Sequence, residues 1–190
     1  NMNISPIRNS LLSLLFLLYF PMIGIAQGTI SLSSYVDPKI GSIGLGRTFI
    51  GPTYPYGMVK PSPDCTCHNN SGWAPMPEQV DGFSQVHVSG TGGGPKYGNI
   101  LVTPFHEGFD QTSHIDYREY ETIQLGYYDT TFKNSGIRTE ITTANRASFY
   151  RFTYPETSAK GLTIDAGFFL GESPVPDARE AQQFVGSEIQ

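Results

Sequence analysis

Apolar and polar residues alternate over short segments of this chain, and beyond residue 26 no stretch keeps the spacing of an amphipathic helix. Alternation with a period of two places apolar side chains on one face of a strand. Residues 130–133 and 137–142 flank the polar turn 134–136, which predicts a β-hairpin. We therefore predict an all-β fold, an antiparallel β-sandwich, with strands at 85–88, 99–103 (ended by Pro104), 130–133, 137–142, 148–154 and 162–166.

The composition supports this fold class. Charged residues make up 15% of the 190 residues, whereas there are 21 glycines and 14 prolines, a balance typical of short strands joined by turns. Residues 41–98 are rich in glycine and proline, so we expect few long strands there. The formal net charge of −5 repels phosphate backbones, and nucleic acid is therefore not an expected partner.

The N-terminal residues have the pattern of a signal peptide. Arg8 precedes the apolar run 11–25, and Gly24 and Ala26 supply small side chains before a cleavage point after Ala26. The alternative is a membrane anchor, but a spanning helix needs about 20 apolar residues, and this run is shorter and contains Pro21. We expect residues 1–26 to be removed on export to the periplasm or the medium, without a stable membrane span, leaving a single domain over 27–190.

Both ends of the sequence suggest a piece of a longer gene product. Asn1 precedes Met2, and the last residues, 184–190, read as part of a strand with no closing turn. The alternative is a complete small protein with an artefact at its start. We favour the longer product.

The two cysteines, Cys65 and Cys67, are separated by one residue. This short spacing argues against a disulfide bridge between them. His68 is adjacent, but a metal site would need more ligands than this cluster offers. We expect thiols here.

Two glycine-rich segments suggest nucleotide loops but lack the required patterns. Residues 41–49 do not form the dinucleotide fingerprint, and in 90–96 Pro95 stands where the glycine before the P-loop lysine belongs. Glycines also allow a backbone to approach another surface closely, and this is the interpretation we adopt.

His87 and Trp73 each have a structural and a functional interpretation. If the strand around 85–88 is regular, Gln85 and His87 share the face opposite Val86, so His87 points away from the apolar side. A Ser89–His87–Asp81 triad is disfavoured because no serine has the surroundings of a nucleophile elbow. Trp73, the single tryptophan, suits either a core position or stacking on a sugar ring.

Carboxylates are numerous, but glycoside hydrolysis requires two of them on either side of one bond. The sequence does not identify such a pair, and most of these side chains are expected on the solvated surface.

Four ordered blocks nevertheless resemble the N-terminal domain of glycoside hydrolase family 92, the bacterial exo-acting α-mannosidases. The similarity covers about residues 35–190 and includes a weaker stretch at 136–152. The four blocks are Tyr-Val-Asp-Pro-Lys-Ile-Gly at 35–41, the segment 44–64 with Tyr-Pro-Tyr-Gly-Met-Val-Lys-Pro-Ser-Pro-Asp at its end, Gly-Phe-Ser-Gln-Val-His-Val-Ser-Gly-Thr-Gly at 82–92, and Tyr-Gly-Asn-Ile-Leu-Val-Thr-Pro at 97–104.

Some positions depart from the family pattern. Leu45 and Arg47 stand in a loop that is often rich in histidine, and Gln85 replaces a frequent second histidine. Cys65-Thr66-Cys67 and Ser71-Gly72-Trp73 also differ from the usual Trp-Cys and Ser-Gly-Tyr arrangement. If these residues contact sugar, the linkage preference can differ, and we assign none.

The resemblance implies a β-sandwich that packs on a C-terminal (α/α)6 barrel of the same full-length chain. It implies inverting, calcium-dependent hydrolysis of α-mannosides in glycans, with the catalytic carboxylates and calcium ligands in the barrel, beyond Gln190. The chain alone is then expected to be inactive, and its loops are expected to form the rim of the active site. Candidate substrate-binding residues are Asp64, Cys65, Trp73, His87, Ser89, Gly92, Gly93 and Gly94.

Two other functions remain open. The chain can be a freestanding carbohydrate-binding β-sandwich without catalysis, which would bind mannose by itself. It can also be a structural domain whose glycine-rich loops only contact the barrel. Binding of mannose by residues 27–190 distinguishes the first of these from the second.

Overall fold

The computed structural model describes residues 31–44, 46, 48–65, 71–88, 98–107, 116–156, 159–170 and 185–188. The chain divides into two compact units, 1–34 and 35–190, and all strands belong to the second unit. A short 3-10 helix, η1, covers Leu32–Tyr35. Across the described ranges there is no α-helix. None of these residues forms a helix that is long and apolar enough to cross a membrane.

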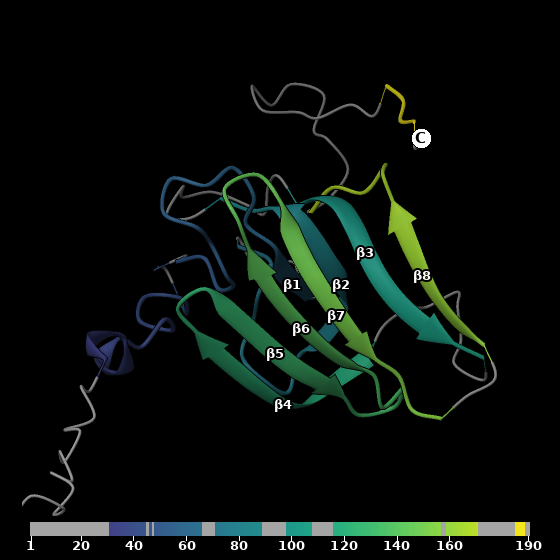
Figure 1. Cartoon of the computed structure of the whole chain (residues 1–190), viewed down its shortest axis with the longest axis horizontal. Helices are drawn as coiled ribbons and strands as arrows, with labels where there is room; N and C mark the ends of the chain where they lie inside the picture. The colour runs from purple at the N-terminus through teal and green to yellow at the C-terminus, as the bar shows by residue number, and fades with distance from the viewer. Residues whose placement is uncertain are drawn as a thin grey trace, which may run out of the picture. The chain divides into compact units, whose positions relative to one another are not determined.

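Within the described ranges, eight antiparallel strands form a single curled sheet (Figure 1). Their order is β7-β6-β5-β4-β2-β3-β8, and β1 pairs with the other edge of β2. The strands are β1 (Ser62–Cys65), β2 (Gln79–Val86), β3 (Asn99–His106), β4 (Asp116–Gln124), β5 (Tyr127–Phe132), β6 (Arg138–Thr143), β7 (Ser148–Thr153) and β8 (Lys160–Asp165).

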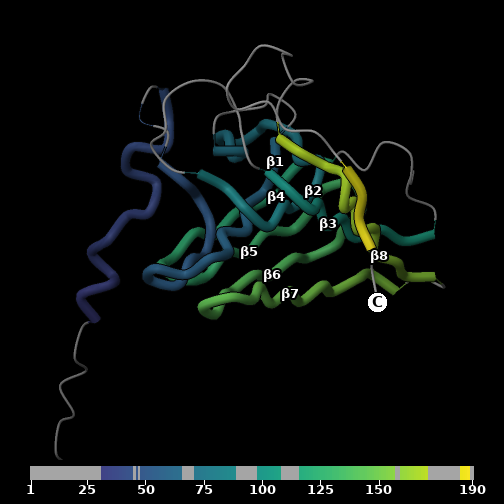
Figure 2. Tube along the Cα trace, turned by 90° about the horizontal axis from the view of Figure 1, so that it is seen from above, coloured from purple at the N-terminus to yellow at the C-terminus, as the bar shows by residue number. Residues whose placement is uncertain are grey.

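Strand β2 is where the sheet curls. Its first residues pair with β4 through Val80 and Asp116, and its later residues pair with β3 through Phe83 and Val102. Because β1 occupies the opposite edge over the same residues, β3 and β4 share one edge of β2. The strands β5–β7 consequently fold over β1–β3 as a second layer (Figures 1 and 2). The predicted all-β antiparallel fold is confirmed, with both layers belonging to one continuous sheet.

The core lies between the two layers and is centred on Phe83 of β2. The Phe83 ring meets Tyr128, Phe132 and Tyr150 at centroid distances of 6.1, 5.9 and 6.4 Å. Such tilted or edge-on aromatic contacts add to the stabilisation from burial alone. The other buried members of this cluster are Cys65, Ala74, Val80, Ile137 and Ile141.

The predicted hairpin and the strands near 99–103, 148–154 and 162–166 are present as β5–β6, β3, β7 and β8. Pro104 does not end β3, contrary to our prediction: it pairs with Leu162, and the strand continues to His106. The ladder with β2 stops at Val102, so β3 has one partner strand at Pro104, and proline is tolerated at such positions. Strands β1 and β4 were not predicted, and β2 is longer than expected.

A buried charge pair joins the second layer to the residues that follow β1. A β-bulge between Arg118 and Tyr120 shifts the register of β4, so Arg118 and Glu121 both have buried side chains, 0% and 7% exposed. One oxygen of Glu121 accepts hydrogen bonds from Arg118 Nη1 at 2.6 Å, Trp73 Nε1 at 2.9 Å and the Tyr128 hydroxyl at 2.6 Å. Arg118 Nη2 donates to the carbonyl oxygens of Ala74 and Glu78 at 2.6 and 3.2 Å.

The outer face of the second layer carries a row of ion pairs. Asp129, Glu140 and Arg151 are directly paired across β5, β6 and β7. Arg138 donates to both oxygens of Asp129 at 3.0 and 2.8 Å, and Arg151 donates to Glu140. The hydrogen bonds from Arg151, and then from Tyr127, lower the pKa of Glu140 to about 2.

The lowered pKa of Glu140 predicts a pH-dependent contribution to stability. The folded state holds this proton less tightly than the unfolded state, so the contribution is present above pH 4.5 and is lost as the pH falls towards about 2. We expect Glu140→Gln to lower the free energy of unfolding more at pH 7 than at pH 3, measured by urea titration at both values. A difference from wild type that is the same at both pH values would contradict the prediction.

The buried charge pair predicts a second, larger effect. Glu121→Leu leaves the Arg118 guanidinium buried without its carboxylate, so we expect a loss of about 3–5 kcal/mol in the free energy of unfolding. Glu119→Leu, on the exposed side of the same strand, is the matched control and is expected to change stability by about 0.5 kcal/mol or less. Urea unfolding of both variants measures this contrast, and equal losses would refute it.

Candidate functional site

The ends of three chain segments meet at one place in the fold, which we call the stem cluster: Asp64, Gly72, Ser84, His87, Gly98 and Leu170. Asp64 and Gly72 lie on either side of residues 66–70, and His87 and Gly98 lie on either side of residues 89–97. Leu170 directly precedes residues 171–184. The cluster therefore gathers the residues next to these three segments, and four of the eight candidate site residues lie in 89–97.

The return of the chain alongside β1 brings Gly72 into the cluster. Cys65 donates its backbone N–H to the Gly72 carbonyl at 2.9 Å, and the Ala74 N–H donates to Cys65 Sγ at 3.1 Å. Gly72 has a φ of +85°, which glycine adopts readily and other residues rarely do. A Cβ at this position would lie 2.5 Å from Asp64 Oδ1 and 2.7 Å from His87 Nε2. Glycine is therefore required here by both conformation and space.

Asp64 and His87 form a fully buried pair at the centre of the cluster. His87 Nε2 lies 2.6 Å from Asp64 Oδ1, and both side chains are 0% exposed. The second carboxylate oxygen of Asp64 accepts a hydrogen bond from the Ser84 backbone N–H at 3.0 Å. His87 Nδ1 lies 2.8 Å from the Lys60 carbonyl oxygen. Both polar ends of each side chain thus have partners, as burial of such groups requires.

Leu170, which precedes the third segment, joins the cluster through its contact with Gly98. A Cβ on Gly98 would lie 2.4 Å from the Leu170 Cβ and 2.9 Å from Ser84 Oγ, so these residues pack against the bare glycine backbone. Ser84 Oγ in turn lies 3.1 Å from His87 Nε2. Leu170 is 2% exposed. A continuous set of contacts therefore connects Gly72, next to residues 66–70, with Leu170, next to residues 171–184.

The geometry at His87 does not support nucleophilic catalysis. In a Ser-His-Asp triad the serine and the carboxylate bind opposite ring nitrogens. Here Asp64 and Ser84 both approach Nε2, while Nδ1 faces a carbonyl oxygen. The phenol next to the cluster is also held in its protonated form: burial raises the pKa of Tyr150, whose hydroxyl accepts a hydrogen bond from Gln85.

The structure unites two of the predicted site residues and separates a third. Asp64 and His87 are in contact, and Cys65 is the neighbour of Asp64 in β1. The prediction that His87 points away from the apolar side is wrong: β2 ends at Val86, and His87 turns inward to 2% exposure. Trp73 is 3% exposed, donates to Glu121 and lies 6.0 Å below the Arg118 guanidinium, so its ring belongs to the interior.

The remaining candidates, Ser89, Gly92, Gly93 and Gly94, lie outside the described residues, as does Cys67. Sequence reasoning missed Ser84, Gly72 and Gly98. Gly98 had a detectable signal, because a glycine directly before an apolar strand often marks a close approach of another backbone. Ser84 had none, since its role depends on contacts between distant segments.

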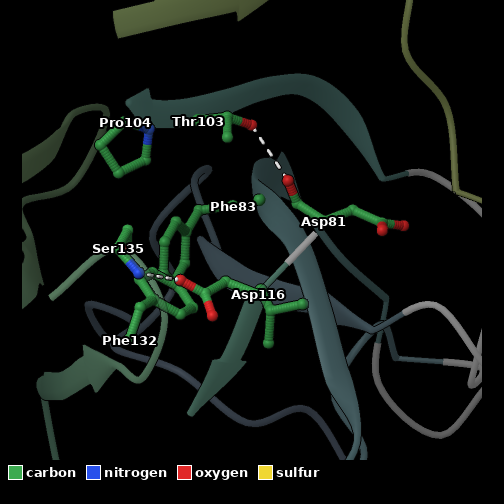
Figure 3. Close-up of a pocket in the computed structure, with 9 residues that line it drawn as sticks. Asp81, Phe83, Thr103, Pro104, Asp116, Phe132 and Ser135 are labelled. Carbon is green, nitrogen blue, oxygen red and sulfur yellow. Dashed lines mark hydrogen bonds between the residues drawn. The ribbon is translucent and has the colours of Figure 1, made fainter. Parts of the chain in front are cut away.

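A small pocket beside the start of β2 is not a sugar site. Asp81, Phe83, Thr103, Asp116 and Ser135 are among its lining residues, and it has room for about one water molecule (Figure 3). The Asp116 carboxylate accepts backbone hydrogen bonds from Tyr117, Asn134 and Ser135 at 2.7, 3.0 and 2.8 Å. The Asp116 carboxylate therefore holds the turn between β5 and β6 in place.

Within the described part of the chain, no three His, Cys, Asp or Glu side chains lie close enough together to hold a metal ion. The described residues therefore do not fit a calcium site.

Three comparisons relate this chain to known proteins. Residues 35–190 match the family model described as the glycosyl hydrolase family 92 N-terminal domain. An uncharacterized secreted glycosidase of the fungus Arthroderma benhamiae is 31% identical over 137 residues, a match that covers 66% of this chain and 18% of the fungal protein.

Solved structures give the same relationship. A family 92 α-mannosidase from Bacteroides thetaiotaomicron matches with a TM-score of 0.68 and 28% identity, over 75% of this chain and 21% of that protein. Its complex with mannoimidazole matches with a TM-score of 0.65 and 28% identity, over 74% and 20%. The chain thus spans about a fifth of the length of these relatives. On the match over residues 35–190, the chain belongs to glycoside hydrolase family 92 and carries its N-terminal domain.

Proposed function

We propose that this chain is the N-terminal domain of an exported, calcium-dependent, inverting exo-α-mannosidase that acts on mannose-containing glycans. The family match over residues 35–190 is the observation that carries the proposal, and the likeness to an α-mannosidase at 28% identity supports the substrate class. The secreted fungal relative and the signal-like residues 1–26 support export.

The catalytic carboxylates belong, in this proposal, to a C-terminal barrel of the same full-length protein. Inversion requires an acid and a base about 6.5–9.5 Å apart on either side of an accessible bond. The buried acidic side chains among the described residues are engaged otherwise. Asp64 binds His87, Asp116 binds backbone N–H groups, Glu121 binds Arg118, and Asp129 and Glu140 bind arginines. Calcium is assigned to the barrel for the same reason, since the described residues do not fit it.

The stem cluster supports a role at the rim of the active site. It gathers the attachment points of residues 66–70 and 89–97, which include or adjoin the predicted candidates Ser89, Gly92, Gly93 and Gly94. We assign direct sugar contacts to these segments. Asp64, Cys65, Trp73 and His87 are buried and serve the site by supporting the segments.

The barrel of the same protein is the proposed partner for an apolar stretch near the start of the domain. An exposed set of large apolar side chains of this kind usually marks an interaction surface. Its members are Tyr35, Val36, Ile40, Ile43, Tyr54, Tyr56 and Met58, and Tyr56 is fully exposed.

The test is a comparison of the full-length gene product with residues 27–190 alone. We expect only the longer protein to release mannose from an α-mannoside such as 4-nitrophenyl α-mannoside, and we expect chelation of calcium to abolish this activity. Proton NMR of the first product should show β-mannose, the anomer that inversion produces. The β-mannoside and the α-glucoside are the matched control substrates.

Other outcomes would identify a different function. An inactive full-length protein, together with binding of methyl α-mannoside by residues 27–190, would replace the proposal with a freestanding carbohydrate-binding module. Release of α-mannose as the first product would refute the inverting mechanism, and full activity after calcium removal would refute the metal requirement.

A further inference from the structure

The hydrogen bonds around His87 determine how many protons the Asp64–His87 pair holds. The Lys60 carbonyl oxygen can only accept, so the ring nitrogen that faces it, Nδ1, carries a proton. Nε2 lies 2.6 Å from Asp64 Oδ1, and two lone pairs cannot face each other at that distance. A second proton therefore lies between Nε2 and Oδ1. With either formal placement of this proton the pair is neutral overall, which allows both groups to be 0% exposed.

The same two side chains hold separate parts of the chain together. Asp64 belongs to β1, His87 follows β2, and Asp64 also accepts the Ser84 N–H. Gly72 packs directly on both side chains of the pair, and Gly98 packs between Ser84 and Leu170. None of these contacts leaves room for an added methyl group. We call the residues that flank segments 66–70, 89–97 and 171–184 the stems. Their relative positions therefore depend on the distance between Asp64 and His87.

We propose that Asp64 and His87 are a positioning pair that fixes the backbone at Gly72, Val88, Gly98 and Leu170, and through it the part of the sugar site that this domain supplies. The proposal rests on the proposed function for its link to substrate. Because neither side chain is exposed, the pair acts through the stems and does not touch sugar. It differs in this from our sequence-based prediction, which gave both residues direct sugar contact.

The conservative variant separates the hydrogen bond from the charge. In Asp64→Asn the amide can donate to Nε2 of a neutral ring, while its oxygen still accepts the Ser84 N–H. In Asp64→Ala both hydrogen bonds are lost. Asp116→Ala is the matched control, because Asp116 is an equally buried carboxylate that pairs with the opposite end of β2. Its loss is expected to weaken the fold without loosening the stems.

Two measurements on the full-length gene product test the proposal. Hydrogen exchange at Gly72, Val88, Gly98 and Leu170 should accelerate about tenfold in Asp64→Ala and less than about threefold in Asp64→Asn. In Asp116→Ala, exchange at these four residues should accelerate no more than exchange at residues far from the mutation. The KM for an α-mannoside should rise about tenfold in Asp64→Ala, with kcat changed by less than about threefold, because the reacting groups lie elsewhere. Asp116→Ala should leave KM unchanged.

Several results would overturn the proposal. One is hydrogen exchange at the stems that is no faster in Asp64→Ala than in Asp116→Ala. A second is faster exchange at the stems with an unchanged KM. A third is an Asp64→Asn variant whose exchange and KM change as much as those of Asp64→Ala. If the full-length protein hydrolyses no α-mannoside, the proposed function fails, while hydrogen exchange still decides whether the pair fixes the stems.

A measurement on the unmodified protein covers the case in which Asp64→Ala does not fold. With nitrogen-15-labelled histidine, the spectrum should contain two slowly exchanging downfield protons at the His87 ring, one on Nδ1 and one shared with Asp64. In Asp64→Asn the ring Nε2 accepts from the amide, so the second ring proton should disappear while the proton on Nδ1 remains. A single downfield proton at the wild-type ring would refute the shared proton and the pair with it.

Discussion

The buried pair of Arg118 and Glu121 is the constraint on which the arrangement of the two layers depends. Two charges in an aromatic interior are tolerated only when nearly all their hydrogen-bonding groups have partners. Here the partners come from separate parts of the fold: Tyr128 from β5, and Trp73 and the Ala74 carbonyl from residues 71–74, which we call the strap. A shift between β4 and the strap would break the hydrogen bond from Trp73 to Glu121 and the one from Arg118 to the Ala74 carbonyl.

This constraint extends to the stem cluster through four consecutive buried residues, 71–74. Trp73 is held by Glu121, and its neighbour Gly72 packs on Asp64 and His87. Cys65 connects the same strap to β1 through Gly72 and Ala74. The strap therefore lies between two buried acid–base pairs, one in the core and one beneath the stems. The two pairs are joined by a very short piece of backbone, in which Gly72 has a φ of +85° that residues other than glycine rarely adopt.

The same charges explain which parts of the fold the sequence could predict. The β5–β6 hairpin and β7 follow the period-two pattern because Tyr128, Phe132, Ile141 and Tyr150 lie on their inward face, although Thr130 and Thr139 are also buried there. Strand β4 was missed because Arg118 and Glu121 occupy inward positions and the bulge breaks its period. Strand β1 contains no large apolar residue. Within the site, the sequence identified Asp64 and His87 separately, but their contact and the role of Ser84 depend on pairing between β1 and β2, which no local pattern encodes.

The electrostatics of the described residues also favour support over proton transfer. A glycosidase general acid must retain its proton near neutral pH, which requires surroundings that raise the pKa of its carboxyl group. Among the described residues, four buried acids pair with bases: Asp64 with His87, Glu121 with Arg118, and Asp129 and Glu140 with arginines. Asp116 instead accepts backbone hydrogen bonds. At Glu140 the hydrogen bonds from Arg151 and Tyr127 act in the opposite direction and lower the pKa to about 2. Interactions of this kind fix the side chains in place, which suits a supporting role for this domain.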